Sequence, residues 1–293
     1  MAVNAADADD CRARELDLLT SGNFSDIKAV CGERVWKCHR AILASRSVWF
    51  RKALSGPFQE ASSRRVNLEE KDPIFVDLAL KHIYGNGLDV ESSISPDHFM
   101  GECVSLWQTA DFLLLNSLKS SVEKAVHNYC DRRMKQLCTR LFRPKWANEI
   151  KGKLTAWAID MIIGIRGAYR WNVEGLKAVL VEFTWAGRRC TLDARIVSTT
   201  LDHLKDTPAF VADLLAFFAS TSSTKSAVWA PHRSGRTWTA TCRRCGTEIF
   251  WGNNEQAEGQ ILDPFGLDGG LGWCRDCGNL DMTPWREGGA NDH

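Results

Sequence analysis

The sequence predicts an α+β domain at the N-terminus, then an all-α helical segment, and finally a small β-rich unit. Three observations support this order. Two β-rich runs precede a series of helical patterns before residue 130. Apolar residues recur at intervals of three and four between residues 131 and 220, and paired cysteines with tryptophans and glycines fill the region after residue 236. A chain of 293 residues has room for two or three such domains.

Composition excludes several classes of protein. The chain is 44% hydrophobic and 25% charged, with a net charge of +1, so it resembles neither a disordered protein nor a wholly basic nucleic-acid binder. The most apolar stretch, Ala209 to Ala219, has 11 residues and contains Asp213, whereas a membrane span needs about 20. No secretory signal pattern opens the sequence. We therefore expect no membrane contact, a cytoplasmic or nuclear location, and 11 cysteines that are reduced thiols or metal ligands.

The first domain is expected over residues 16–130, after a flexible N-terminus at 1–15. A short helix leads into two β-rich runs at 27–31 and 35–38, and the glycine-containing turn between them predicts a hairpin. Helical turns follow, and then a short strand at 66–68. The pair Asp72-Pro73 predicts a capped helix start, with Gly85 ending that helix. Two further helices are predicted after Ser95-Pro96-Asp97 and over 118–129.

These residues resemble a BTB/POZ domain. The match includes Ser25-Asp26, the run "HRAIL" from His39, the segment Ser47 to Phe50, the run "FQE" from Phe58, and "IYG" ending at Gly85, and it continues through "ADFLLLNSLKSSVEKAV". The chain looks most like the single-BTB proteins common in fungi. The resemblance implies an interaction module rather than an enzyme. It also implies homodimers formed through the N-terminal helix and, in many members, docking to a cullin scaffold as a ubiquitin ligase adaptor.

Asp26 and Arg40 occupy positions that line a shared charged pocket in dimeric members of the family. The resemblance therefore implies a role for both in dimer formation. A local role is the alternative, in which Asp26 caps a turn and Arg40 pairs within its own subunit, since a buried ion pair guarantees no net stability.

Phe58-Gln59-Glu60 fits the pattern of an apolar residue, any residue and a glutamate that cullin adaptors of this family carry. An exposed Phe58 would insert into a partner pocket while Glu60 fixes its orientation. In the alternative, Phe58 packs against its own core and Glu60 is solvated. His39 has no carboxylate or second histidine at catalytic spacing, so we expect a structural histidine bonded to backbone.

Residues 131–220 are expected to form a helical segment. It has the position of the BACK extension that follows the BTB domain in several family members, so we describe it as BACK-like. Residues 131–153 hold eight basic side chains and two acidic ones. Such a stretch can contact phosphate or direct nuclear import, but a solvated helix face is the simpler interpretation because few aromatic residues lie between the charges.

The C-terminal part carries the strongest chemical motif. After a polar linker at 221–236, a module at 237–286 contains two Cys-x-x-Cys-Gly sequences, and a flexible tail at 287–293 follows. Two intervening residues allow a tight turn to direct both sulfurs to one cation, and two facing turns supply the closed tetrahedral shell of structural zinc. Its ligands would be Cys242, Cys245, Cys274 and Cys277. The flanking strand patterns resemble a zinc ribbon, with its long glycine-rich connection at 259–272 forming a loop, and we predict one Zn²⁺.

Other interpretations of the cysteines agree less well with the sequence. Redox chemistry of the thioredoxin type requires one such pair in a βαβ unit, and a zinc deaminase requires a His-x-Glu sequence that is absent at suitable spacing. Four cysteine ligands also leave no open position for catalysis. Arg243 and Arg244 permit nucleic-acid contact, while exposed tryptophans would favour contact with protein.

The sequence therefore predicts a non-enzymatic protein–protein interaction protein. It would self-associate through its BTB domain and act as an adaptor that presents an unknown client, with a cullin-type ubiquitin ligase as the concrete partner. The alternative is a nuclear transcription or chromatin regulator in which the dimer uses the zinc ribbon and the basic patches to contact nucleic acid.

Overall fold

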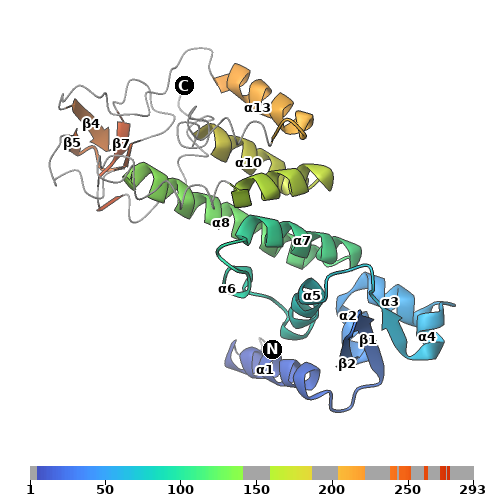
Figure 1. The fold of residues 1–293 in the computed structure, drawn as a ribbon. Helices are drawn as coiled ribbons and strands as arrows, with labels where there is room; N and C mark the ends of the chain where they lie inside the picture. The colour runs from blue at the N-terminus through green and yellow to red at the C-terminus, as the bar shows by residue number, and fades with distance from the viewer. Residues whose placement is uncertain are drawn as a thin grey trace. The chain divides into compact units, whose positions relative to one another are not determined.

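The structure is a computed structural model that describes residues 5–140, 159–186, 204–221, 238–242, 244–251, 261–262, 271–274 and 276–277. The chain divides into two compact units, Met1–Ala125 and Val126–His293 (Figure 1). Each unit is described separately below. The predicted tail at 287–293 lies outside the described residues, as do the linker from 222 onward and the basic stretch from 141 to 153.

A three-stranded sheet organises the first unit. Antiparallel pairing joins β1 (Ile27–Cys31) to β2 (Arg34–Cys38), and parallel pairing joins β1 to β3 (Arg65–Asn67), which gives the strand order β2-β1-β3. The hairpin that the sequence predicts is confirmed, and Gly32 takes a positive φ of 56° in its turn. One face of the sheet packs on the core through Ala29, Cys38 and Val66, each at most 1% exposed.

Helix α1 (Ala5–Ser21) begins earlier than the sequence suggested, within the stretch expected to be a flexible N-terminus. Its first turns are rich in alanine, a strong helix former, and in aspartate, which is favourable near a helix N-terminus. Arg14 also pairs with Asp10 one turn earlier. Leu16 of α1 lies against Gly85, where an added Cβ would make ordinary van der Waals contact with the leucine side chain at 3.4 Å.

Three short helices follow the hairpin: α2 (Arg40–Arg46), α3 (Val48–Ser55) and α4 (Gln59–Ser63). Ser47 separates the first two. Its hydroxyl accepts the Phe50 backbone N–H at 3.1 Å and donates to the Leu113 carbonyl at 2.8 Å. One buried side chain therefore caps α3 and joins it to the end of α7, a later helix of the same unit.

The predicted helix start at Asp72-Pro73 is confirmed in α5 (Pro73–Gly85), where the Asp72 carboxylate accepts the Ile74 N–H at 2.8 Å. The helix ends at Gly85, as the sequence predicts, and the left-handed residue that follows it is Asn86, with a φ of 49°. The predicted later helices are also present. The unit continues through α6 (Val90–Ser93), α7 (Phe99–Phe112) and the start of α8 (Asn116–Arg140).

The second unit begins with helices, as the apolar spacing predicted. It contains the remainder of α8, a helical segment at 159–170, α10 (Glu174–Ala186) and α13 (Pro208–Thr221). Ile165, Leu176 and Phe210 are at most 1% exposed and form part of its core. Helix α13 extends through Thr221, so the first residue of the predicted linker is helical. Among the helices that the structure describes, none has the length and apolarity to cross a membrane.

A four-stranded sheet with the order β5-β4-β7-β6 forms the last part of the second unit. Its strands are β4 (Trp238–Cys242), β5 (Glu248–Trp251), β6 (Ile261–Leu262) and β7 (Leu271–Trp273). The hairpin predicted around the first cysteine pair is confirmed as β4–β5. The glycine-rich connection is not a loop throughout, because β6 lies within it and pairs with β7.

Candidate metal centre and interaction surfaces

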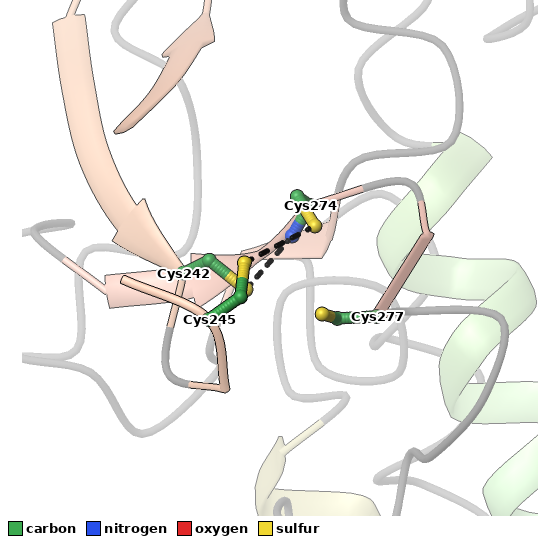
Figure 2. A group of neighbouring side chains, drawn as sticks. All are labelled: Cys242, Cys245, Cys274 and Cys277. Atoms are coloured by element: carbon green, nitrogen blue, oxygen red, sulfur yellow. Dashed lines mark hydrogen bonds between the residues drawn. The ribbon is translucent and has the colours of Figure 1, made fainter. Parts of the chain in front are cut away.

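The four predicted cysteine ligands meet at one place in this sheet. Their sulfur atoms all lie within 4.8 Å of one another, although the two pairs are separated by 28 residues in sequence. Figure 2 shows the side chains of Cys242, Cys245, Cys274 and Cys277 directed toward a common centre. The Cys245 and Cys274 sulfurs are 3.7 Å apart. A tetrahedral zinc site with metal–sulfur bonds of about 2.3 Å has sulfur–sulfur edges of about 3.8 Å, so the Cys245–Cys274 separation matches that geometry.

Local backbone structure orients these sulfurs. Cys242 ends β4, and the turn after it closes through hydrogen bonds from the Gly246 N–H to the Cys242 carbonyl at 2.9 Å and from the Cys242 N–H to the Thr247 carbonyl at 2.8 Å. Gly246 has a φ of 72°, which explains the glycine after the pair. Parallel pairing of β4 with β7 then brings Cys274 beside Cys242, and the Cys274 N–H donates to the Cys242 sulfur at 3.4 Å.

Electrostatics differ among the four thiols. Hydrogen bonds with the side chain and backbone of Thr247 lower the pKa of Cys245 to about 6, and its sulfur is 3.1 Å from the Thr247 hydroxyl. Burial and hydrogen bonds with the neighbouring thiols raise the pKa of Cys277 to about 12. Thiolates are the metal-binding form, and a cation at the centre would favour all four. Thr247 is a supporting residue that the cysteine motif alone did not reveal.

Phe58 immediately precedes α4 and is 55% exposed, while Glu60 in the first turn of that helix is half-buried. The Phe58 ring lies over Gly56, where an added Cβ would be 2.7 Å from a ring carbon. Phe58 is therefore only partly covered by its own domain. A large apolar surface remains available beside Glu60, as an insertion role requires.

Asp26 and Arg40 make local contacts within the first unit. The Asp26 carboxylate accepts the Arg40 backbone N–H at 2.8 Å. The Arg40 guanidinium instead donates to the Leu54 carbonyl at 2.7 Å and to the Ala61 carbonyl at 3.0 Å. The two side chains thus meet through the backbone, and the arginine ties the ends of α3 and α4 together.

His39 has the structural role that the sequence predicted. Its Nε2 is 2.7 Å from the Asn23 carbonyl, and its Nδ1 is 2.9 Å from the Tyr84 hydroxyl. The hydrogen bond to Asn23 holds the turn before β1, in which Phe24 takes a positive φ of 60° and is 91% exposed. An exposed aromatic residue in a left-handed conformation is uncommon. Nothing in the sequence pattern had singled out Phe24.

The pair predicted for nucleic-acid contact is only half described. Arg244 is exposed in the turn between β4 and β5, and Arg243 lies outside the described residues.

Comparison with known proteins identifies a family over most of the first unit and the first residues of the second. A family model described as "BTB/POZ domain" matches residues 16–129. Kelch-like protein 41 of Mus musculus is 31% identical over 83 residues, which cover 28% of this chain and 14% of the relative. BTB and MATH domain-containing protein 15 of Caenorhabditis elegans is 27% identical over 121 residues, which cover 39% of this chain and 44% of the relative. The chain thus spans only a small part of the Kelch-like relatives.

Two solved structures are also similar to part of the chain. The BTB domain of zebrafish PATZ1 gives a TM-score of 0.34 at 18% identity and covers 43% of this chain and 96% of its own. The BTB domain of human Gigaxonin gives a TM-score of 0.33 at 22% identity and covers 42% of this chain and 93% of its own. The family match ends at residue 129, so the BACK-like and ribbon-like assignments of the later segments stay predictions, as does the resemblance to fungal proteins.

Proposed function

Because residues 16–129 form a BTB/POZ domain, we propose that this chain is a non-enzymatic adaptor that self-associates through that domain and recruits partner proteins. The observation that carries the proposal furthest is Phe58, which is 55% exposed two residues before Glu60. A cullin-type scaffold is the partner whose docking pattern these two residues fit. The relative named BTB and MATH domain-containing protein 15 combines a BTB domain with a second module, which supports an adaptor role.

The physical argument for docking rests on Phe58. Burial of its exposed surface in a partner pocket gives a hydrophobic gain of about 1 to 2 kcal/mol, and aromatic anchors of this kind often dominate an interface. Glu60 follows within the first turn of α4, where its carboxylate can fix the orientation of a basic or N–H donor group of the partner.

Affinity purification of the full chain tests this proposal. We expect a cullin scaffold to co-purify with the natural chain and to be lost from the variant that combines Phe58→Ala with Glu60→Ala. Ile74→Ala is the matched control, because Ile74 is a similarly exposed apolar side chain, at 59%, on a different helix of the same domain. Unchanged cullin recovery with the double variant would refute the docking role.

Self-association is proposed to use the surface around Phe24 and Asp26. Phe24 offers a second copy an apolar side chain that is 91% exposed, and the His39 contact holds its turn in place. Sedimentation of the full chain should give twice the monomer mass, and Phe24→Ser should shift it toward monomer. Leu114→Ser is the control, since Leu114 is also exposed and also has a positive φ. A dimer that persists equally in both variants contradicts this assignment.

For the C-terminal sheet we propose one structural zinc ion bound by Cys242, Cys245, Cys274 and Cys277. The sulfur separations support it, and a unit with so little apolar core gains its folding energy from the metal. When bound, the ion would join the turn after β4 to the turn after β7. Elemental analysis of the full chain should find about one zinc per chain, and Cys274→Ser should reduce it severely. A folded sheet without zinc would refute the assignment.

A further inference from the structure

Three cationic side chains form a row across one exposed face of the β2-β1-β3 sheet. In the strand register, Lys28 of β1 lies opposite Lys37 of β2 on one side and opposite Arg65 of β3 on the other. Residues in register point to the same face of a sheet, so the three side chains project together. All three are exposed.

This row is unfavourable for the isolated domain. Adjacent strands are about 4.8 Å apart, and like charges directly opposite each other destabilise a sheet. Across the part of the chain that the structure describes, neither Lys28 nor Lys37 has an ion pair, and the Arg65 Nε donates to the neutral Asn67 side chain at 3.0 Å. Asp26 lies two residues before Lys28, but its carboxylate accepts the Arg40 N–H. Charge repulsion that no other group in the domain offsets is expected at a functional surface.

An open groove adjoins the β2 end of the row. It has a volume of about 930 Å³ and lies between α1 and β2. Its apolar lining comes from Leu16, Leu19, Val35, Trp36 and Leu88. Val35 lies two residues from Lys37 on the same sheet face and is 55% exposed. An apolar side chain in this groove would therefore lie next to the cations.

The carboxylates that line the groove do not neutralise the three cations. Asp77 lines the groove, but it accepts the Trp36 indole N–H at 2.8 Å and pairs with Lys81 at 2.9 Å. Asp89 also lines it and accepts the Ser92 N–H at 3.4 Å as the cap of α6. Both carboxylates thus have partners within the domain.

We propose that this sheet face, which we call the cation row, docks an acidic segment of a partner protein. Carboxylates of the segment pair with Lys28, Lys37 and Arg65, and a bulky apolar side chain beside them enters the groove. Within the described sheet, β2 is paired only on its β1 side, so its other edge is open to backbone hydrogen bonds from an extended segment.

The dimensions favour a peptide over a nucleic acid. Three cations across two strand spacings cover about 10 Å, whereas salt-dependent duplex binders typically neutralise about six to ten phosphates. The exposed neighbours on this face are Val35 and Asn67, and neither offers the aromatic ring on which a base would stack. Lys28, Lys37 and Arg65 belong neither to the Phe58–Glu60 site nor to the surface of Phe24 and Asp26, so the proposal goes beyond the adaptor function. The groove beside them is lined in part by α1, the helix through which the family resemblance implies dimers.

Fluorescence anisotropy on the full chain provides the test. The probe is a fluorescein-labelled peptide with one leucine and three glutamates at alternating positions, and a second peptide has glutamine in place of each glutamate. The variant combining Lys28→Gln with Lys37→Gln is compared with a control combining Lys52→Gln with Lys124→Gln, two exposed lysines on α3 and α8. Val35→Ser tests the apolar contact separately.

We expect the glutamate peptide to bind the natural chain and the control, and to bind the Lys28/Lys37 variant about tenfold more weakly. Val35→Ser should also weaken binding, and the glutamine peptide should not bind measurably. Equal binding by the Lys28/Lys37 variant would overturn the proposal, as would equal binding of the two peptides. It would also be overturned if a labelled oligouridine bound more tightly than the peptide and lost affinity in the same variant. The cullin-recovery and sedimentation experiments test other residues, so failure of the cation-row proposal can be told apart from failure of the adaptor proposal.

Discussion

Removal of the Tyr84 hydroxyl offers a demanding test of how the first domain is held together. The Asn23 carbonyl can only accept a hydrogen bond, so the Nε2 of His39, 2.7 Å away, carries the proton. In the neutral ring Nδ1 is then an acceptor and receives the Tyr84 O–H at 2.9 Å. The tyrosine oxygen in turn accepts the His39 backbone N–H at 2.8 Å. The hydroxyl therefore satisfies two buried groups of one residue.

Tyr84→Phe leaves both of these groups without a partner. The ring of Tyr84 is fully buried and would stay in place, so no cavity of consequence forms. Each orphaned buried polar group costs about 1 to 3 kcal/mol, and together they lower the free energy of unfolding by about 2 to 6 kcal/mol. An argument from apolar area alone predicts no loss, because phenylalanine is the more hydrophobic side chain.

Hydrogen exchange of the full chain, read on peptides that contain β1 and β2, measures this loss. A change of about 2 to 6 kcal/mol speeds exchange through cooperative opening by about thirtyfold to more than ten-thousandfold. Tyr169→Phe is the matched control, since the Tyr169 hydroxyl donates to the exposed Asp213 at 2.6 Å, and it should leave the β1 and β2 peptides unchanged. If the β1 and β2 peptides of Tyr84→Phe exchanged within threefold of the rate in the natural chain, the stabilising role of the Tyr84 hydroxyl would be refuted.

Three further predictions concern charge, metal and the sheet face. Burial raises the pKa of Asp77, but the Trp36 indole N–H, Lys81 and Arg34 outweigh it and lower that pKa below its ordinary value. The resulting stability is complete above the unfolded pKa of about 3.9 and disappears as pH falls through the lower folded value. Melting temperatures of Asp77→Asn and the natural chain should thus converge only in strong acid, and a constant difference across the whole range would count against this. A zinc chelator should abolish hydrogen-exchange protection of β4 to β7 and leave β1 to β3 unaltered, whereas equal loss in both sheets would contradict a local metal. Lys28→Thr should raise the melting temperature by relieving about 0.2 to 1 kcal/mol of repulsion, and a lower melting temperature would show that the lysine is stabilising.

Much of the fold was predictable where the signal is local. A glycine turn between two β-rich runs was enough to identify the β1–β2 hairpin, and Asp72-Pro73 correctly located the start of α5. The early start of α1 was missed because a polar, aspartate-rich stretch has no apolar periodicity, although its helix propensity is high. Strand β6 was missed because two residues in a glycine-rich connection become a strand only through pairing with β7.

The candidate sites divide in the same way. The cysteine quartet was predictable because the same Cys-x-x-Cys-Gly motif occurs twice and each motif contains its own two ligands. The approach of the four sulfurs to within 4.8 Å agrees with that prediction. The cation row was not predictable. Lys28 and Arg65 meet only because β1 and β3 pair in parallel across a long separation in sequence, and no local pattern specifies that register. Phe24 was likewise hidden, since its exposure follows from a backbone conformation.

The closeness of the cysteine sulfurs also determines how the C-terminal sheet can be damaged. Without the proposed zinc ion and in air, the Cys245 and Cys274 sulfurs start 3.7 Å apart and need to approach by less than 2 Å to reach a disulfide bond length of about 2.05 Å. The Cys245 thiol, with its pKa near 6, is already ionised at neutral pH and is the natural first site of oxidation. Oxygen would then take two electrons from the pair and, with the Cys274 proton and one proton from water, leave as hydrogen peroxide, so that the disulfide-bonded chain no longer takes up metal. Preparations kept under a reducing agent and supplied with zinc should retain full occupancy, while aerated ones should lose it and regain it only after reduction.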